Sequence, residues 1–489
     1  MSPKPARLSK SKIISGVQCL KKLWLEVNNP QVGEVSEAAS QLMGSGARVG
    51  ELARTQFANG ILIAEDQSLK DALAQTQAVL QAKQYDAIYE ATIQHEGVLI
   101  KADILTREAD AYTLYEVKAS GSVKAYHYND VAVQTWVLQK AGLPIKASYL
   151  THINTRFVYA EPGNYQGIFT HEDISEGIKE SLSQVEDWVS ACRKTLTGDE
   201  PSIEPGDQCS SPFSCQFVDY CVGETEIEYP ISFLPRAGKL VDEFAEEGIE
   251  DIRHIPEGRL TNAKQVRARE CTINGEPWVS TEASSLIKAL PYPRYYLDFE
   301  SVNPAIPIWL GTRPYQQVPF QWSCHIEQED GSITHKGFLE TKGEDPTKGF
   351  TKSLVETISE EGCVLVYNAA FENSVMREMA ARFPEYAARL EQIIAQVFDL
   401  LKVARDHYYH RDMAGSWSIK AVLPCIAPHL NYNELDTVHH GGEAQLAYQE
   451  LVHPDTSEER KKVLKDALEK YCELDTWAMV EIARFFEKQ

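Results

Sequence analysis

The chain has 489 residues, of which 43% are hydrophobic and 24% are charged. This composition is typical of a globular protein, and at roughly 150 residues per domain it predicts two to four domains. No run of about 18 apolar residues occurs, so we expect no membrane-spanning helix. The net charge of −23 argues against a protein that coats nucleic acid without regard to sequence.

The N-terminal segment, residues 1–12, is basic and polar and lacks an apolar stretch, so we expect no secretory signal and a cytoplasmic protein. The ten cysteines should then stay reduced. Six basic residues precede the first acid, Glu26, and form either a nucleic-acid track or a solubilising tail: Lys4, Arg7, Lys10, Lys12, Lys21 and Lys22. Helices are predicted over residues 9–27, with Cys19, and 36–57, with Glu51.

Residues 85–118 change to the two-residue period of strands and predict a three-stranded meander. Asp103 lies in its second strand. Glu116 and Lys118 lie in the third strand and are two residues apart, so they share one face. Two acids on neighbouring strands beside a lysine predict a metal site, in which the lysine orients or helps to deprotonate a water molecule.

A helix is predicted over residues 126–141, with Gln134 on its apolar face beside Val131 and Leu138. An amide on such a face needs a hydrogen-bond partner. A hydrogen bond inside the core is the interpretation that this helix alone favours.

Four cysteines are set apart by their spacing: Cys19, and then Cys209, Cys215 and Cys221. Four thiolates can hold an iron–sulfur cluster or a structural zinc ion. Zinc ribbons usually contain two Cys-x₂-Cys pairs, and none occurs here. The spacing therefore favours an iron–sulfur cluster over zinc.

These motifs together resemble the iron–sulfur RecB-like nucleases of the PD-(D/E)XK superfamily, namely the CRISPR-associated Cas-type exonucleases and the AddB-type modules. The resemblance implies a restriction-endonuclease-like fold over residues 1–222, a [4Fe–4S] cluster that clasps the two ends of the domain, and Glu51 as a further metal or substrate contact. Two departures are the five-residue gap between Cys209 and Cys215 and the presence of Leu138 where many relatives carry tyrosine.

Residues 223–290 predict short helices joined by glycine turns and resemble a helix-hairpin-helix connector. Lys264, Arg267 and Arg269 form a small basic run that could hold a nucleic-acid backbone. A purely structural linker is the alternative.

The segment Tyr295–Glu300 predicts a buried strand with Asp298 and Glu300 on one face. A divalent cation such as Mg²⁺ or Mn²⁺ would relieve the repulsion between the two acids. A solvated strand end is the alternative. A further strand, residues 363–368, leads into a helix with Glu372 in its first turn.

The last helix carries an apolar stripe that includes Tyr471 and Asp475. We expect Asp475 to face the core and to share a metal with Asp298, because a buried acid seldom lacks a partner. The alternative places Asp475 at the edge of the stripe.

The motifs Asp298-x-Glu300, Asn368-x₃-Glu372 and Tyr471-x₃-Asp475 resemble the three exonuclease motifs of the DEDDy branch of the DnaQ-like family. The resemblance implies a ribonuclease-H-like fold over residues 291–489 and two-metal 3′→5′ exonucleolysis, with the four acids as metal ligands and Tyr471 orienting the attacking water. Glu372 departs from the aspartate usual there. The whole arrangement resembles an uncharacterised bacterial family that fuses the two nuclease types.

The sequence thus predicts an α/β multidomain, metal-dependent nuclease with two candidate active sites, acting on nucleic acid with DNA favoured over RNA. The alternative is a nucleic-acid-binding scaffold in which one or both sites are inactive.

Overall fold

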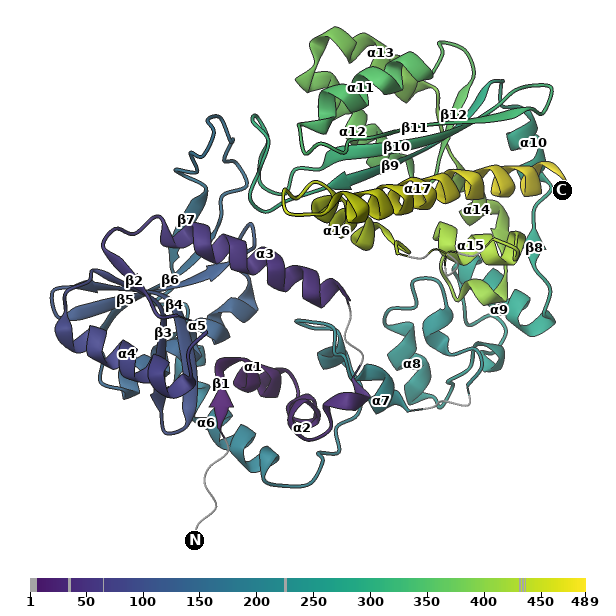
Figure 1. Ribbon diagram of the computed structural model, residues 1–489. Coiled ribbons are helices and arrows are strands. Elements are labelled where there is room, and N and C mark those ends of the chain that lie inside the picture. Colours follow the sequence, from purple (N-terminus) through teal and green to yellow (C-terminus); the bar gives the residue numbers. More distant parts are fainter. Residues whose placement is uncertain are drawn as a thin grey trace. The chain divides into compact units, whose positions relative to one another are not determined.

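The computed structural model describes residues 7–33, 37–64, 66–223, 227–430, 432, 435 and 437–489, with the backbone only for 37–45. It is a mixed α/β structure with three sheets (Figure 1). The chain divides into two compact units, Met1–Thr225 with Pro304–Tyr315, and Glu226–Asn303 with Gln316–Gln489. Among the described residues, no helix combines the length and apolar character needed to cross a membrane.

The first unit is built on a sheet in the order β2-β3-β4-β5-β6-β7, with β1 paired to β4. Its strands are β1 Leu8–Ser9, β2 Gly60–Leu62, β3 Ala87–His95, β4 Val98–Glu108, β5 Ala111–Lys118, β6 Ile145–Ile153 and β7 Phe169–Asp173. Strands β3, β4 and β5 are antiparallel neighbours, which confirms the predicted meander. Strand β6 lies parallel to β5, because the helix α5, Ala125–Lys140, crosses over between them.

The helices of the first unit are α1 Lys10–Gln18, α2 Leu20–Asn28, α3 Glu37–Arg54, α4 Leu69–Ala82, α5 Ala125–Lys140, α6 Lys179–Leu196 and α7 Val218–Val222, with the short 3₁₀ turns η1 Pro30–Val32 and η2 Asp207–Cys209. The helix predicted over 126–141 is confirmed as α5. The single helix predicted over 9–27 is wrong, because the chain is extended at Cys19 (φ −162°, ψ 123°) and forms two helices. Cys19 therefore lies at the junction between α1 and α2.

The second unit contains a sheet in the order β11-β10-β9-β12-β13 and a small pair, β14-β8. The strands are β8 Trp278–Val279, β9 Arg294–Val302, β10 Val318–Glu327, β11 Ile333–Leu339, β12 Cys363–Val366, β13 Val397–Asp399 and β14 Tyr408–Tyr409. Strand β9 is central, antiparallel to β10 and parallel to β12. The strands predicted over 295–300 and 363–368 are confirmed as β9 and β12, although β12 ends at Val366.

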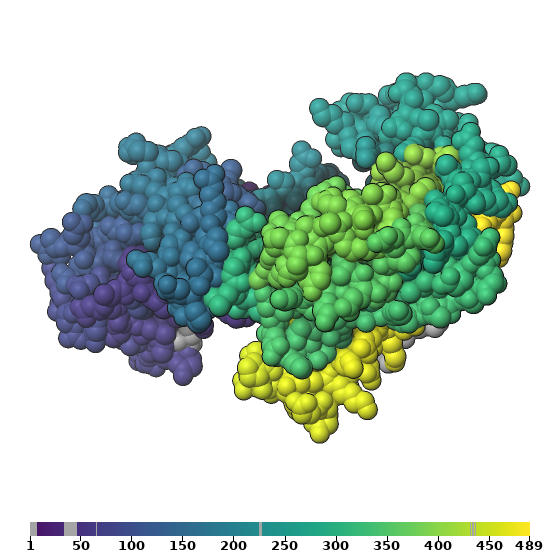
Figure 2. Space-filling view, turned by 90° about the horizontal axis from the view of Figure 1, so that it is seen from above, coloured from purple at the N-terminus to yellow at the C-terminus, as the bar shows by residue number. Residues whose placement is uncertain are grey.

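The helices of this unit are α8 Leu240–Glu246, α9 Ala263–Asn274, α10 Glu282–Lys288, α11 Pro346–Thr357, α12 Ala369–Arg382, α13 Pro384–Ala395, α14 Leu400–His407, α15 Ile419–Ile426, α16 Gly441–Leu451 and α17 Glu458–Glu487, with η3 Ile231–Phe233, η4 Ile252–His254 and η5 Arg411–Met413. Helices α11, α12 and α13 cover one face of the large sheet and α17 crosses the other (Figure 1). In the space-filling view, yellow atoms of the C-terminal region lie beside green atoms from the middle of the second unit (Figure 2).

Successive side chains of β9 point to opposite faces of the large sheet. Tyr295, Leu297 and Phe299 pack in the core beneath α11–α13. Tyr296 packs in the opposite core, which also contains Met479 and Ile482 of α17 and residues of the segment 229–290. The segment expected as a connector therefore shares the hydrophobic core of the second unit. Asp298 and Glu300 continue the face of Tyr296 toward α17.

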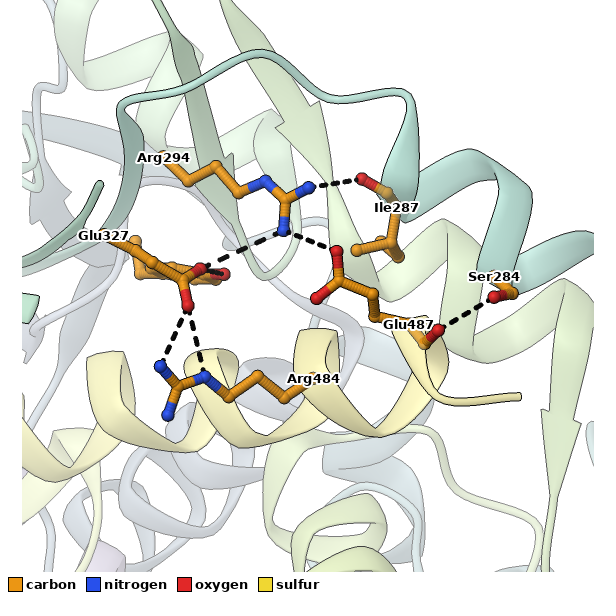
Figure 3. Close-up of polar contacts among 7 residues, drawn as sticks. Ser284, Ile287, Arg294, Glu327, Arg484 and Glu487 are labelled. Carbon is orange, nitrogen blue, oxygen red and sulfur yellow. Dashed lines mark hydrogen bonds and ion pairs between the residues drawn. The ribbon is translucent and has the colours of Figure 1, made fainter. Parts of the chain in front are cut away.

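A buried ion-pair network joins the C-terminal end of α17 to the sheet (Figure 3). Arg294 at the start of β9 is 2% exposed, and its Nη1 lies 3.2 Å from Glu487 Oε1 and 4.0 Å from Glu327 Oε2. Its Nη2 donates to the carbonyl of Ile287 at 2.9 Å. Arg484 binds Glu327 at 2.9 Å. These bonds fix the position of α17 relative to β9 and β10.

Candidate active sites

Three acids from distant parts of the second unit meet at one point. Ligand oxygens of Asp298, Glu300 and Asp475 all lie within 4.8 Å of one another, and among the described residues no other group of three or more such ligand atoms is so close. Two of the acids come from β9 and the third from α17. The expectation that Asp475 faces the core is confirmed, since the residue is 7% exposed.

The electrostatics of this cluster favour a bound cation. Burial and the neighbouring acids raise the pKa values of Asp298 and Glu300 well above the usual range. Burial raises the pKa of Asp475 to about 6. Hydrogen bonds from Tyr432 and Tyr471 and the positive charge of Lys420 lower this pKa and so offset part of the effect of burial. Metal ions suit such a set of oxygens, because a cation removes the repulsion that keeps the acids protonated.

Two tyrosines and a lysine surround Asp475. The hydroxyl of Tyr432 donates to Asp475 Oδ1 at 2.5 Å. Lys420 Nζ lies 5.0 Å from the ring centre of Tyr432 and 5.3 Å from that of Tyr471, and it donates a hydrogen bond to the carbonyl of His439. Tyr471 is where the DEDDy resemblance requires it, one turn before Asp475. Lys420 gives the acid cluster one fixed positive charge.

The opposite side of the cluster is closed by a thiol and a helix end. Cys472 is buried, and its Sγ donates to Asp298 Oδ2 at 3.6 Å. A side chain on Gly441, in the first turn of α16, would place its Cβ 3.9 Å from Glu300 Oε2. The sequence does not single out Cys472, because a buried cysteine on a helix carries no signal of its neighbours.

Glu372 lies near the cluster without joining it. It is 2% exposed on α12, and its Oε2 has no hydrogen-bond partner among the described residues. Its charge acts on Asp298 and Glu300, but its oxygens lie outside the group of three. Burial raises the pKa of Glu372 to about 8, with a contribution from Asp399. Asp399 caps α14 by accepting a hydrogen bond from Leu401 N at 3.0 Å.

The first unit brings Asp103, Glu116 and Lys118 together, as the sequence predicts. Lys118 Nζ lies 2.9 Å from Glu116 Oε1 and also contacts Asp130 of α5. Gln134 donates a buried hydrogen bond to Glu116 Oε2, which supplies the partner that an amide on this apolar face needs. Asp103 Oδ2 accepts from Val117 N at 2.7 Å.

A second lysine, which sequence reasoning placed only in a basic track, enters this site. Lys10 Nζ lies 2.6 Å from Glu116 Oε1. Burial alone would raise the pKa of Glu116, but Lys10 and Lys118 outweigh it and hold this pKa below its usual range. Burial and the charge of Glu116 raise the pKa of Asp103 to about 7. The two acids thus differ in protonation at neutral pH.

Glu51 is not brought to this pair. Its side chain is exposed on α3, and it is not among the charged groups that act on Asp103 or Glu116. The further acid that acts on Asp103 is Glu90 of β3, which is held by Arg54 at 3.1 Å. Glu90 interrupts the pairing of β3 with a left-handed backbone (φ 55°). This kink cannot be recognised from an ordinary strand pattern.

The four cysteines singled out by their spacing line one small cavity. Cys19 reaches it from the break between α1 and α2, and Cys221 from α7. Gln18 ties the two chain segments together by donating to the carbonyls of Gln208 and Phe213, both at 2.7 Å. All four cysteines are free thiols.

Comparisons with known proteins place these sites in a wider group of sequences. Residues 295–418, which include Asp298, Glu300 and Glu372, match the family described as Domain of unknown function (DUF2779). Three curated relatives match over 40–44% of this chain. The uncharacterized protein UU173 of Ureaplasma parvum is 28% identical over 239 residues, which are 44% of this chain and 34% of that protein.

The uncharacterized MG366 homolog of Mycoplasma pneumoniae is 27% identical over 228 residues, or 43% of this chain and 34% of its own length. The uncharacterized protein MG366 of Mycoplasma genitalium is 25% identical over 214 residues, which are 40% of this chain and 32% of that protein. The match therefore spans about a third of the length of each relative.

Proposed function

We propose that the protein is a metal-dependent nuclease with two active sites, a PD-(D/E)XK-type site in the first unit and a DEDDy-type 3′→5′ exonuclease site in the second, and that DNA is favoured over RNA as substrate. The observation that carries the proposal is the convergence of Asp298, Glu300 and Asp475 within 4.8 Å. Acids this close in a buried site are stable as carboxylates only beside a cation.

In the second unit, the residues have distinct roles. Asp298, Glu300 and Asp475 would hold Mg²⁺ or Mn²⁺. A bound divalent ion supplies charge stabilisation for the phosphate and lowers the pKa of a water molecule. Tyr471 orients that water, and Tyr432 holds Asp475 in place. Lys420 supplies a cation close to where negative charge develops on the phosphate.

In the first unit, Asp103 and Glu116 would hold a divalent cation with Lys118 beside them. Gln134 fixes the carboxylate of Glu116 through its Oε2. Asp130 fixes the ammonium group of Lys118. The roles assigned to these residues by the PD-(D/E)XK resemblance thus have supporting contacts in the structure.

We also propose that Cys19, Cys209, Cys215 and Cys221 hold a [4Fe–4S] cluster. Zinc ribbons usually contain two Cys-x₂-Cys pairs, and these four cysteines contain none. Their sequence spacing supports a cluster, with zinc as the alternative.

One observation favours the alternative function, a nucleic-acid-binding scaffold. Lys10 and Lys118 already neutralise Glu116 in the first unit without a metal. If the contact with Lys10 persists when nucleic acid binds, this site would hold a strand without cutting it.

The deciding experiment uses anaerobically purified protein with end-labelled single-stranded and duplex DNA and RNA in Mn²⁺ or Mg²⁺. Asp298→Asn and Lys118→Met are compared with matched controls, Glu469→Gln on an exposed position of α17 and Lys101→Met on an exposed position of β4. If each site variant removes one cleavage ladder and its control does not, both sites are nucleases. Wild-type protein that binds the strands but leaves them intact would establish the scaffold instead.

A further inference from the structure

A cavity of about 620 Å³ lies inside the second unit, outside the acid cluster. This volume is in the range of sites that bind small ligands. Its wall includes three basic side chains, those of Arg236, Lys264 and Arg405, and no acidic residue. The chain as a whole has 71 acidic and 48 basic residues, so a wall with this charge is unusual for the molecule.

The two arginines are available to a ligand. Neither Arg236 nor Arg405 forms an ion pair within the described part of the chain, whereas Lys264 binds Asp406 at 2.9 Å. Arg236 also has a left-handed backbone (φ 52°), which costs roughly 1–2 kcal/mol in a residue with a side chain. Unpaired guanidinium groups facing one cavity are suited to bind phosphate oxygens in pairs.

Aromatic and amide groups complete the wall. Trp417 lines the cavity with its indole fixed by a hydrogen bond to the carbonyl of Tyr408 at 2.9 Å. Tyr367 also lines it and donates to the carbonyl of Trp417 at 2.7 Å. Aromatic rings beside cations are the usual means of binding single-stranded nucleic acid, because bases stack on the rings while cations contact the backbone.

The loop that forms one wall is held in place by a close approach. Gly415 (φ 76°) lies so near Phe233 that a Cβ on it would be 2.3 Å from the carbonyl oxygen of Phe233. Only glycine allows this contact, so the loop 415–418 and the segment that leads to Arg236 form one rigid rim.

The same loop connects the cavity to the acid cluster. Ser418 and Ile419 line the cavity, and the next residue, Lys420, lies over the rings of Tyr432 and Tyr471. A strand whose end lies among Asp298, Glu300 and Asp475 therefore has this cavity as its adjacent binding surface.

We infer that this cavity binds a nucleotide of the substrate strand adjacent to the one at the acid cluster, with Arg236 and Arg405 on phosphate and Trp417 against a base. The inference rests on the proposed exonuclease function and specifies its substrate as a single-stranded nucleic acid, DNA or RNA. It also assigns a function to the 229–290 segment, which supplies Arg236 and Lys264.

The test measures binding without cleavage, by fluorescence anisotropy of labelled single-stranded DNA, single-stranded RNA and duplex DNA in EDTA. We expect the Arg236→Ala/Arg405→Ala variant to bind single strands at least about tenfold more weakly, because each arginine loses charge-assisted hydrogen bonds. The slope of log K against log salt should fall by about 0.7 for each lost phosphate contact. The two single-strand arms show which nucleic acid is preferred.

The control is Lys348→Ala/Lys352→Ala, which removes the same charge from exposed positions on α11, on the other face of the sheet. Equal weakening by both double variants, or none by the arginine pair, would overturn the inference. A strand carrying 5-bromouracil should also crosslink to Tyr367 or Trp417, and crosslinks confined to residues 7–223 would contradict the assignment. If binding depends on the two arginines but Mn²⁺ supports no cleavage, the cavity assignment stands and the nuclease proposal fails. If the protein cleaves and the arginine variant has an unchanged KM, the nuclease proposal stands and the cavity assignment fails.

Discussion

Tyr432 and Asp475, which lie 43 positions apart in the sequence, are joined by a hydrogen bond of 2.5 Å from the tyrosine hydroxyl to the carboxylate. Asp475 is the acid of the cluster whose pKa is raised least, to about 6, since Tyr432, Lys420 and Tyr471 offset part of the effect of burial. The bond therefore keeps one carboxylate of the site ready to bind a cation near neutral pH.

Tyr432→Phe should weaken Mn²⁺ binding about five- to tenfold, because a charge-assisted hydrogen bond to Asp475 is lost. Loss of the donor raises the pKa of Asp475 further above 6, so the defect should be larger at pH 6 than at pH 8. Isothermal titration calorimetry of Mn²⁺ binding at pH 6 and pH 8 measures this defect. Tyr448→Phe, which removes a similar bond to Glu340 at 3.1 Å outside the site, is the matched control and should bind Mn²⁺ normally.

Lys420→Met should lower kcat/KM of the proposed exonuclease activity about 100-fold, by analogy with removal of a single group that stabilises a developing charge. Lys420 also lowers the pKa values of Glu300 and Asp475. Its loss should shift the acidic limb of the pH–rate profile to higher pH. Lys420→Arg keeps the positive charge and should restore most of the pH–rate profile. Wild-type rates in the methionine variant would show that Lys420 takes no part in the reaction.

Glu372→Gln should change how stability depends on pH. In the unfolded chain Glu372 ionises near pH 4.5, but in the folded chain it stays protonated until about pH 8. The folded state binds more protons between these values, so this group makes stability fall as pH rises from 4.5 to 8, by an amount on the order of a few kcal/mol. Without metal, the glutamine variant should unfold at a higher temperature than wild type at pH 8.5 and show little difference at pH 4.5. An equal difference in unfolding temperature at both pH values would contradict the raised pKa of Glu372.

Cys221→Ser should abolish the chromophore of the proposed iron–sulfur cluster and loosen the first unit. The proposed cluster would join the break between α1 and α2 to the 209–221 segment, so its loss should free both segments. We expect loss of bound iron and sulfide, loss of visible absorbance, and faster proteolysis near residues 19 and 209. Cys192→Ser, at a buried cysteine outside the cavity, should keep the chromophore. Stoichiometric zinc without iron in anaerobically prepared wild type would replace the cluster with the alternative metal.

Arg294→Met should destabilise the second unit by about 3–5 kcal/mol, because Glu487 and Glu327 lose a buried partner. Helix α17 also loses its connection to β9, so Asp475 should be held less firmly opposite Asp298. We therefore expect weaker Mn²⁺ binding at temperatures where the variant is still folded. Arg460→Met, which breaks the exposed pair with Glu450 near the other end of α17, should change the unfolding free energy by less than about 1 kcal/mol.

The local patterns were sufficient to predict much of this protein. The two-residue period placed Asp298 and Glu300 on one face of β9 and Glu116 and Lys118 together on β5, because side-chain direction in a strand depends only on spacing. The stripe on the last helix predicted that Asp475 faces the core. Apolar runs and turns likewise predicted the meander and the strands of the second sheet.

Other features were decided only by the tertiary structure. Lys10 reaches Glu116 across 106 positions, and Lys420, in the first turn of α15, and Tyr432 reach the acid cluster from positions that no local period specifies. The cavity wall with Arg236 and Arg405 exists because the 229–290 segment packs in the second unit's core. Sequence spacing determines which face of an element a residue occupies, whereas long-range packing determines what that face meets, because contacts between elements depend on shape and charge distributed over the whole fold.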